Sequence, residues 1–254
     1  MTTTSISRLT LGICGLLLFS TAASAYVLLS PPRRWFPADL ARIVHVDDGG
    51  LASVNDADHG VSQAVIAVER WNGGPSGNVV AGAAGSVVYT LGDGRSDLIF
   101  GDPLNICAGS CLAATTVGYY NAETACCDGL TVRRYTDSDV AYNLSFSWTS
   151  ETEADGCSGE FSLEAVTTHE VGHLIGLGHS STSSALMYPS ISSCNNKSLS
   201  VDDTNGSDAL YACASFTPGS CGGGSCKASG QSCTTNGECC SGGCKGKPGR
   251  KTCR

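Results

Sequence analysis

The chain is poor in charge and in long apolar runs. Charged residues make up 15% of its 254 positions, below the usual quarter. Lysine and arginine number 15 against 23 aspartates and glutamates, so the net charge is −8. This balance excludes a basic nucleic-acid-binding protein for the bulk of the chain. The apolar run at residues 9–19 is shorter than the roughly 20 residues that cross a bilayer, so we expect no stable membrane insertion.

Cysteine and glycine are abundant instead. Fifteen cysteines are typical of a secreted protein in an oxidising compartment. The 32 glycines indicate many turns and long loops. Hydrophobic residues make up 41% of the chain, which is enough for a sizeable core.

The first residues have the pattern of a secretory leader. Arg8 precedes the apolar run at residues 9–19, and Ala23-Ser24-Ala25 supplies the small residues that signal peptidase reads. We therefore predict a signal peptide at residues 1–25 and a secreted, extracellular protein. An uncleaved membrane anchor is the alternative, and it would require a longer apolar run. Cleavage would remove Cys14 and leave an even number of cysteines for disulfide pairing.

Charge and composition change together near residue 220. Residues 26–220 carry a net charge of −14, and residues 221–254 carry +5. We therefore predict a main domain at 26–213, a glycine-rich linker at 214–225 and a small cysteine-rich domain at 226–254. The basic tail is a candidate for binding an anionic surface or a protein partner.

Hydrophobic periodicity predicts an α+β (α/β-like) main domain built on one mixed sheet. Ser162 is a candidate N-cap, and Ser200 with Asp203 has capping-box spacing. The predicted helices are 56–71, 162–175 and 200–212, and the predicted strands are 40–46, 86–91, 97–100, 112–120, 130–135 and 139–146.

Three of the chain's five histidines lie in residues 169–179. His169 and His173 are four residues apart, so on a helix both imidazoles leave the same face. Gly176 can adopt the positive φ that ends the helix and returns His179 to the same point. Three ligands of this kind can hold one Zn²⁺ and leave a fourth position open, as in catalytic zinc sites.

Glu170 follows the first histidine directly and can reach a water at the open position. As a general base it would take the proton of a zinc-activated water that attacks a carbonyl carbon. It would then deliver this proton to the departing amine. The residues therefore predict a zinc endopeptidase acting on proteins or peptides, with Glu170 as the catalytic residue.

The pattern HExxHxxGxxH at residues 169–179 resembles the metzincin zinc-binding motif. Metzincins also have a methionine turn beneath the metal, and Met187 in the segment ALMYP is similar to it. Ser180 after the third histidine makes the segment resemble the matrixin (matrix metalloproteinase-like) branch. The resemblance implies a metzincin catalytic domain with a twisted mixed sheet, an active-site helix and a cleft walled by Tyr188 and Pro189. Substrate would pair with an edge strand, for which residues 112–120 are our candidate.

Some features of the matrixin pattern are missing. The usual propeptide cysteine motif is not found between the predicted leader and the domain, so latency would work otherwise or not exist. Ala113 and Ala114 stand where a histidine ligand of a second zinc is expected, so we predict one zinc. Cys107 and Cys111 are expected to staple this loop instead.

The tail resembles the knottin framework, since six cysteines include an adjacent pair. That resemblance implies the pairs Cys226–Cys240, Cys233–Cys244 and Cys239–Cys253, although six cysteines alone allow 15 pairings. The eight cysteines of the main domain allow 105.

Asp93, Asp97 and Asp102 lie in a glycine-rich loop and predict a possible calcium site. Solvated turn carboxylates are the competing interpretation.

Two other functions stay open from the sequence alone. One is a catalytically silent surface-binding protein, and the other is an inhibitor or toxin-like tail carried on an inert domain.

Overall fold

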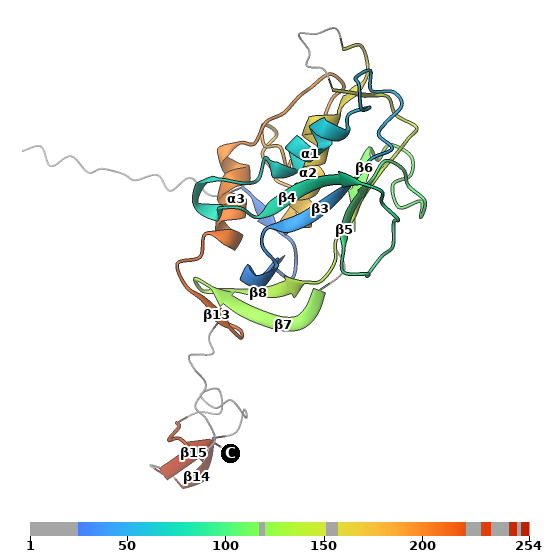
Figure 1. Ribbon diagram of the computed structural model, residues 1–254. Coiled ribbons are helices and arrows are strands. Elements are labelled where there is room, and N and C mark those ends of the chain that lie inside the picture. Colours follow the sequence, from blue (N-terminus) through green and yellow to red (C-terminus); the bar gives the residue numbers. More distant parts are fainter. Residues whose placement is uncertain are drawn as a thin grey trace, which may run out of the picture.

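A five-stranded mixed sheet forms the centre of the main domain (Figure 1). The computed structural model describes residues 25–116, 120–150, 157–221, 230–234, 244–247 and 250–253. The strand order is β4-β3-β5-β9-β6. The first four strands are parallel, and β6 lies antiparallel at the end of the sheet. The strands are β3 Arg42–Asp47, β4 Val80–Gly85, β5 Ser96–Ile99, β6 Ala113–Thr115 and β9 Val140–Tyr142.

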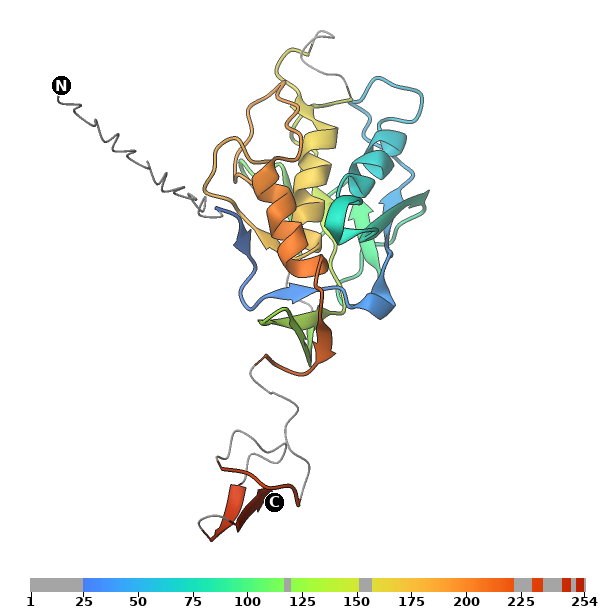
Figure 2. The ribbon, with the colours of Figure 1, turned by 90° about the vertical axis from the view of Figure 1, so that its left-hand side faces the viewer.

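Three α-helices pack beside this sheet, and Figure 2 shows them next to one another. They are α1 Val61–Glu69, α2 Leu163–Leu174 and α3 Val201–Tyr211. The apolar positions Val61, Ala64 and Val68 of α1 are buried at helical spacing. α1 packs on β4 and on α2, and α2 packs on β6. No helix within the described ranges is long and apolar enough to cross a membrane.

A second sheet has the order β13-β7-β8-β2. Its strands are β13 Phe216–Pro218, β7 Tyr120–Cys127, β8 Leu130–Tyr135 and β2 Arg33–Arg34. Disulfides Cys126–Cys221 and Cys127–Cys213 attach the chain after α3 to β7. Residues 214–221 therefore pack on the main domain, whereas the sequence placed them in the linker. The remaining elements are β1 Val27–Leu28, β10 Trp148–Thr149, β11 Phe161–Ser162, β12 Leu177–Gly178, β14 Cys244–Lys247, β15 Arg250–Cys253 and the short 3-10 helices Pro37–Asp39 and Gly74–Ser76.

The predicted helix at 56–71 begins later in the structure, at Val61. The carboxylate of Asp56 accepts a hydrogen bond from the Gly60 N–H at 2.7 Å. That of Asp58 accepts one from the Ser62 N–H at 3.0 Å. Because short acidic side chains compete for backbone donors, they form a turn before the helix.

The prediction of a strand at 86–91 is wrong, since the strand in this region is β4, Val80–Gly85. Its alanines and glycines have low β-propensity. A Cβ at Gly82 would lie 2.8 Å from the Val65 carbonyl oxygen of α1, so the helix requires a small residue there. Two predicted strands are also shorter in the structure. The predicted strand at 139–146 contains only β9. Within the predicted strand at 112–120, β6 spans Ala113–Thr115 and β7 begins at Tyr120, and residues 117–119 lie outside the described ranges.

Candidate metal centre

Helix α2 carries the centre and is held at both ends. The Ser162 hydroxyl accepts the Ala165 N–H at 3.2 Å, which confirms the predicted cap. Four side chains from other elements donate to backbone carbonyl oxygens of α2 and its C-cap: Trp71 to Thr168, Tyr135 to His173, Trp35 to Leu174 and Tyr211 to Ile175, at 2.8–3.2 Å. The last three satisfy carbonyls at the helix end, and the bond to Thr168 holds the middle of the helix.

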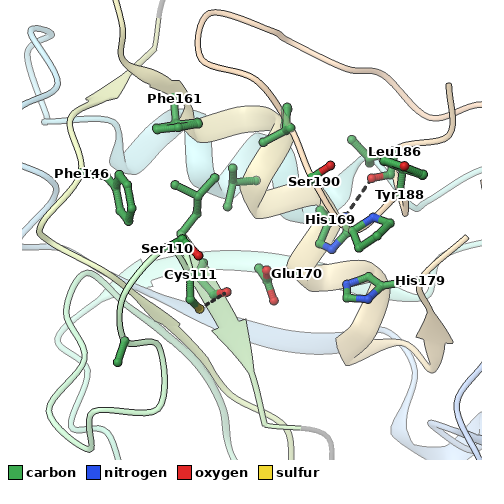
Figure 3. A pocket seen from close by; sticks show the side chains of 17 residues that line it. Ser110, Cys111, Phe146, Phe161, His169, Glu170, His179, Leu186, Tyr188 and Ser190 are labelled. Carbon is green, nitrogen blue, oxygen red and sulfur yellow. Dashed lines mark hydrogen bonds between the residues drawn. The ribbon is translucent and has the colours of Figure 1, made fainter. Parts of the chain in front are cut away.

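The three imidazoles of the motif lie together. The ring centroid of His173 is 4.8 Å from that of His169 and 4.7 Å from that of His179. Ligand atoms of the three rings lie within 4.8 Å of one another. Figure 3 shows His169 and His179 facing the same space beside Glu170.

The donor set fits a zinc ion. Nδ1 of His169 lies 2.8 Å from the Leu186 carbonyl oxygen, and Nδ1 of His173 lies 2.7 Å from that of Leu177. These carbonyls hold the protons on Nδ1 and leave Nε2 free as a ligand. The Nε2 atoms of His173 and His179 are 3.1 Å apart, close to the roughly 3.3 Å expected for two nitrogens on one tetrahedral zinc. Burial lowers the pKa of His173 and of His179, which favours the neutral form that binds a metal.

Gly176 makes the turn between the second and third histidines. Its φ is +112°, and a Cβ there would lie 2.2 Å from the Arg33 carbonyl oxygen. The following β12 pairs antiparallel with β1, with Val27 opposite Gly178. The glycine therefore ends α2, as the sequence predicts, and the strand pair presents His179.

Met187 is buried and lies against α2. It is 2% exposed, and a Cβ at Gly172 would lie 2.3 Å from its Sδ. Gly172 stands between His169 and His173, so its missing side chain makes room for Met187. The Asp203 carboxylate accepts the N–H groups of Leu186 at 2.8 Å and Met187 at 2.9 Å. It thereby holds the whole turn against α3.

Glu170 lines a cleft of about 660 Å³ beside the histidines. Its side chain is largely buried, and its Oε2 accepts a 2.6 Å hydrogen bond from the Thr115 hydroxyl of β6. Tyr188 and Pro189 also lie in the cleft wall. The rest of the lining is mostly apolar and includes Leu112, Ala113, Phe146, Phe161, Ala165, Val166, Leu186 and Ile191.

The three aspartates of the predicted calcium site do not converge. Asp102 accepts the N–H groups of Ile106 and Cys107, and so holds a turn. The Asp97 N–H instead donates to Asp139 at 3.0 Å. Within the described residues, no group of three aspartates has its oxygens within 4.8 Å of one another.

Asp97 belongs to a buried acidic cluster that we define as Asp97, Asp137 and Asp139. All three are at most 1% exposed, and each has one carboxylate oxygen without a hydrogen-bond partner. Burial and the neighbouring Asp137 raise the pKa of Asp139 to about 7.

Five disulfides join described cysteines. The predicted Cys107–Cys111 staple is confirmed, and Cys157 pairs with Cys194. In the tail, Cys233 pairs with Cys244, one of the three pairs that the knottin resemblance implies. Cys226, Cys239 and Cys240 lie outside the described residues, as does the side chain of Cys253, so the knottin framework stays a prediction. Lys245 and Lys247 are exposed on β14, and an anionic partner for them also stays a prediction.

Thr115, Asp137 and Asp139 have no role among the site residues predicted from the sequence. Thr115 and Glu170 are 55 residues apart, so no local pattern links them. Asp137-Ser138-Asp139 before a strand is a recognisable acidic signal, and its burial was visible only in the fold. The sequence predicts Asp203 as part of a helix capping box. Its hydrogen bonds with the Leu186 and Met187 N–H groups are found only in the structure.

Comparison with known proteins gives one family and several relatives. Residues 124–212 match the Matrixin family model. A 50-residue segment is 58% identical to Metalloendoproteinase 1-MMP of Arabidopsis thaliana, covering 19% of this chain and 14% of that protein. Metalloendoproteinase 1 of Glycine max is 54% identical over 52 residues, which are 20% and 17% of the two chains. Interstitial collagenase B of Mus musculus is 42% identical over 74 residues, which are 29% and 15%.

The matched part spans less than a fifth of the length of these relatives. The segment that the Matrixin family model matches includes His169, Glu170, His173, His179 and Met187. The α+β main domain, with α2, the three histidines and the Met187 turn, therefore contains a matrixin-like segment at residues 124–212.

Proposed function

We propose that the protein is a secreted zinc endopeptidase that hydrolyses peptide bonds in proteins or peptides. One observation carries the proposal: three imidazoles converge beside a buried carboxylate at an apolar cleft. The match of residues 124–212 to the Matrixin family supports the same chemistry. Metalloendoproteinases among the similar proteins support it as well.

His169, His173 and His179 would hold the zinc through Nε2. When bound, zinc lowers the pKa of water toward 7 and polarises a carbonyl oxygen. The Leu186 and Leu177 carbonyls orient the first two rings, and Met187 provides an apolar floor for the centre.

Glu170 performs the proton transfers. Its carboxylate takes one proton from the attacking water, whose oxygen bonds to the carbonyl carbon of the substrate. The proton then passes to the amide nitrogen as the carbon–nitrogen bond breaks. Because the side chain is largely buried in the cleft wall, few solvent molecules compete for this proton.

The substrate would lie extended along β6, which ends the sheet next to the cleft. Backbone pairing with an edge strand holds a peptide without regard to its sequence. Tyr188 and Pro189 would wall the pocket for the side chain that follows the cleaved bond.

Chelation is the direct test of this function. The purified protein should cleave casein, lose activity when a chelator removes zinc and regain it when one equivalent of zinc returns. Failure to cleave casein or a peptide library with zinc bound would refute the enzyme proposal and favour the silent surface-binding alternative.

The cysteine content supports secretion. Eight main-domain cysteines form four disulfides, which persist in oxidising compartments. Residues 1–24 lie outside the described residues, so the leader stays a proposal. Mass spectrometry of the secreted protein should find Tyr26 at the N-terminus.

We also propose that the buried cluster of Asp97, Asp137 and Asp139 makes the stability of the protein depend on pH. The groups around Asp139 are mostly acidic: Asp137, Asp97 and Asp93 raise its pKa, while Arg42 lies nearby and Arg95 pairs with Asp97 at 3.1 Å. Since no three described aspartates have their oxygens within 4.8 Å of one another, calcium stays a prediction from the sequence.

This cluster predicts a pH dependence of stability. With a pKa raised to about 7, Asp139 binds its proton more tightly in the folded than in the unfolded state. The free energy of unfolding should therefore fall as pH rises from about 4 to about 7.

The measurement is thermal unfolding at constant zinc, with Asp139→Asn as the variant. This variant should flatten the pH dependence. A fall in stability between about pH 4 and pH 7 that persists in Asp139→Asn would assign the dependence to other groups.

A further inference from the structure

Thr115 is the residue of β6 that contacts the proposed general base. Its hydroxyl oxygen lies 2.6 Å from Oε2 of Glu170 and 3.0 Å from the Glu170 backbone oxygen. A hydroxyl has one proton to donate, and the shorter contact is to the charged acceptor. Hydrogen bonds to a carboxylate are the stronger kind, so the proton lies toward Oε2.

The strand that carries Thr115 is fixed from its other side. The next residue, Thr116, donates its N–H to the Asp139 carbonyl oxygen at 2.8 Å and accepts the Asp139 N–H on its hydroxyl at 2.9 Å. The Ser138 hydroxyl donates to the Thr116 carbonyl oxygen at 2.9 Å. Thr115 is therefore presented from a rigid element, as accurate positioning requires.

Helix α2 holds Glu170 from the opposite side. The Trp71 and Tyr135 side chains donate to carbonyl oxygens on either side of it in the helix, at Thr168 and His173. The backbone of Glu170 is thus fixed, and its side-chain torsions are the remaining freedom. The Thr115 hydroxyl removes this freedom, because it engages one of the two carboxylate oxygens.

We propose that Thr115 is a positioning residue for catalysis, which orients the Glu170 carboxylate and leaves Oε1 as the oxygen that exchanges protons with water and the leaving amine. This inference rests on the proposed endopeptidase function. Because Oε2 of Glu170 already accepts the proton of the Thr115 hydroxyl, Oε1 is the oxygen left to take a proton from water. The two carboxylate oxygens therefore have separate tasks. A misplaced base costs rate more than substrate affinity, since substrate contacts the rest of the cleft.

The test compares Thr115→Val, which keeps the shape and removes the hydroxyl, with Thr115→Ser, which keeps the hydroxyl. Losing a hydrogen bond to a charged group should lower kcat about 10- to 100-fold in Thr115→Val. Its KM should change less than about threefold, and Thr115→Ser should restore kcat to within about threefold of wild type. Zinc content should be unchanged in both variants.

A matched control is Thr167→Val, which removes a hydroxyl of α2 that lies 2.6 Å from the Tyr142 hydroxyl. It should lower Tm and leave kcat near wild type. A second readout is the inhibition constant of a hydroxamate, whose O–H group can donate to the oriented carboxylate. This constant should rise in Thr115→Val and return in Thr115→Ser.

Three results would overturn the proposal while the wild type still cleaves peptide. They are an unchanged kcat in Thr115→Val, an equal loss in the valine and serine variants, or a change confined to KM. The last would assign Thr115 to substrate binding on β6. A wild type that binds zinc and cleaves nothing would instead refute the proposed function itself, and the role of Thr115 with it.

Discussion

Replacing Glu170 by glutamine is expected to lower kcat about 10²- to 10⁴-fold, the range for a lost general base. Glutamine keeps the size of the side chain and can still contact the Thr115 hydroxyl, but its amide cannot take a proton from water. The three histidines and their carbonyl partners are untouched, so zinc content and Tm should stay close to wild type.

The measurement is steady-state cleavage of a fluorogenic peptide, with zinc determined by mass spectrometry on the same samples. Glu164→Gln is the matched control on α2. Glu164 pairs with Arg70 at 2.6 Å near the surface, and such pairs contribute little. This variant should keep kcat within about twofold. A Glu170→Gln protein that cleaves at the wild-type rate with zinc bound would remove Glu170 from the mechanism.

The part of the site that could be predicted from sequence is the part encoded locally. His169 and His173 are one helical turn apart, and Gly176 must turn the chain because no side chain fits beside the Arg33 carbonyl. The cap at Ser162 and the capping box at Ser200 are likewise set by neighbours in the chain. Predictions for α2 and α3 are therefore accurate to about one residue at each end.

The elements that sequence analysis missed depend on distant contacts. β4 forms a strand despite its small residues because it pairs with β3 and packs on α1, with Val65 against Gly82. β7 is polar in sequence and pairs with both β8 and β13, and two disulfides hold it to the chain after α3. Periodicity detects neither, because close packing and crosslinks outweigh the local preference.

The same distinction applies inside the site. The zinc ligands and Glu170 stand in one segment of eleven residues that can be read from the sequence. Their supports come from elsewhere: Thr115 from β6, Trp71 from the end of α1 and Asp203 from α3. A motif names the reacting groups, and the fold supplies the groups that orient them.

Replacing Asp203 by asparagine should have the largest effect on the stability of the centre. The carboxylate is 1% exposed and accepts four hydrogen bonds, from the Leu186, Met187 and Ser200 N–H groups and the Ser200 hydroxyl, at 2.7–2.9 Å. An asparagine NH₂ group would face donors instead of accepting from them. Removing one partner from such a buried charged network costs about 3–5 kcal/mol, which corresponds to a fall in Tm of roughly 10 °C.

Zinc affinity should fall together with Tm, because the turn that Asp203 holds also supplies the Leu186 carbonyl that orients His169. The loss of such an orienting contact typically costs 10- to 100-fold in metal affinity. Competition with a chromophoric chelator measures this change. Asp202→Asn is the matched control, since Asp202 precedes Asp203 on α3 but accepts from the Ser180 hydroxyl.

Asp202→Asn should lower Tm and zinc affinity less than Asp203→Asn, because Asp202 is less buried and does not contact the Met187 turn. If Asp203→Asn lost stability and kept full zinc affinity, the turn would serve folding alone. The histidines would then be oriented by α2 and β12 without help from α3. We expect stability and zinc affinity to fall together because Asp203 of α3 accepts the hydrogen bonds of Leu186 and Met187, which lie beneath the metal centre.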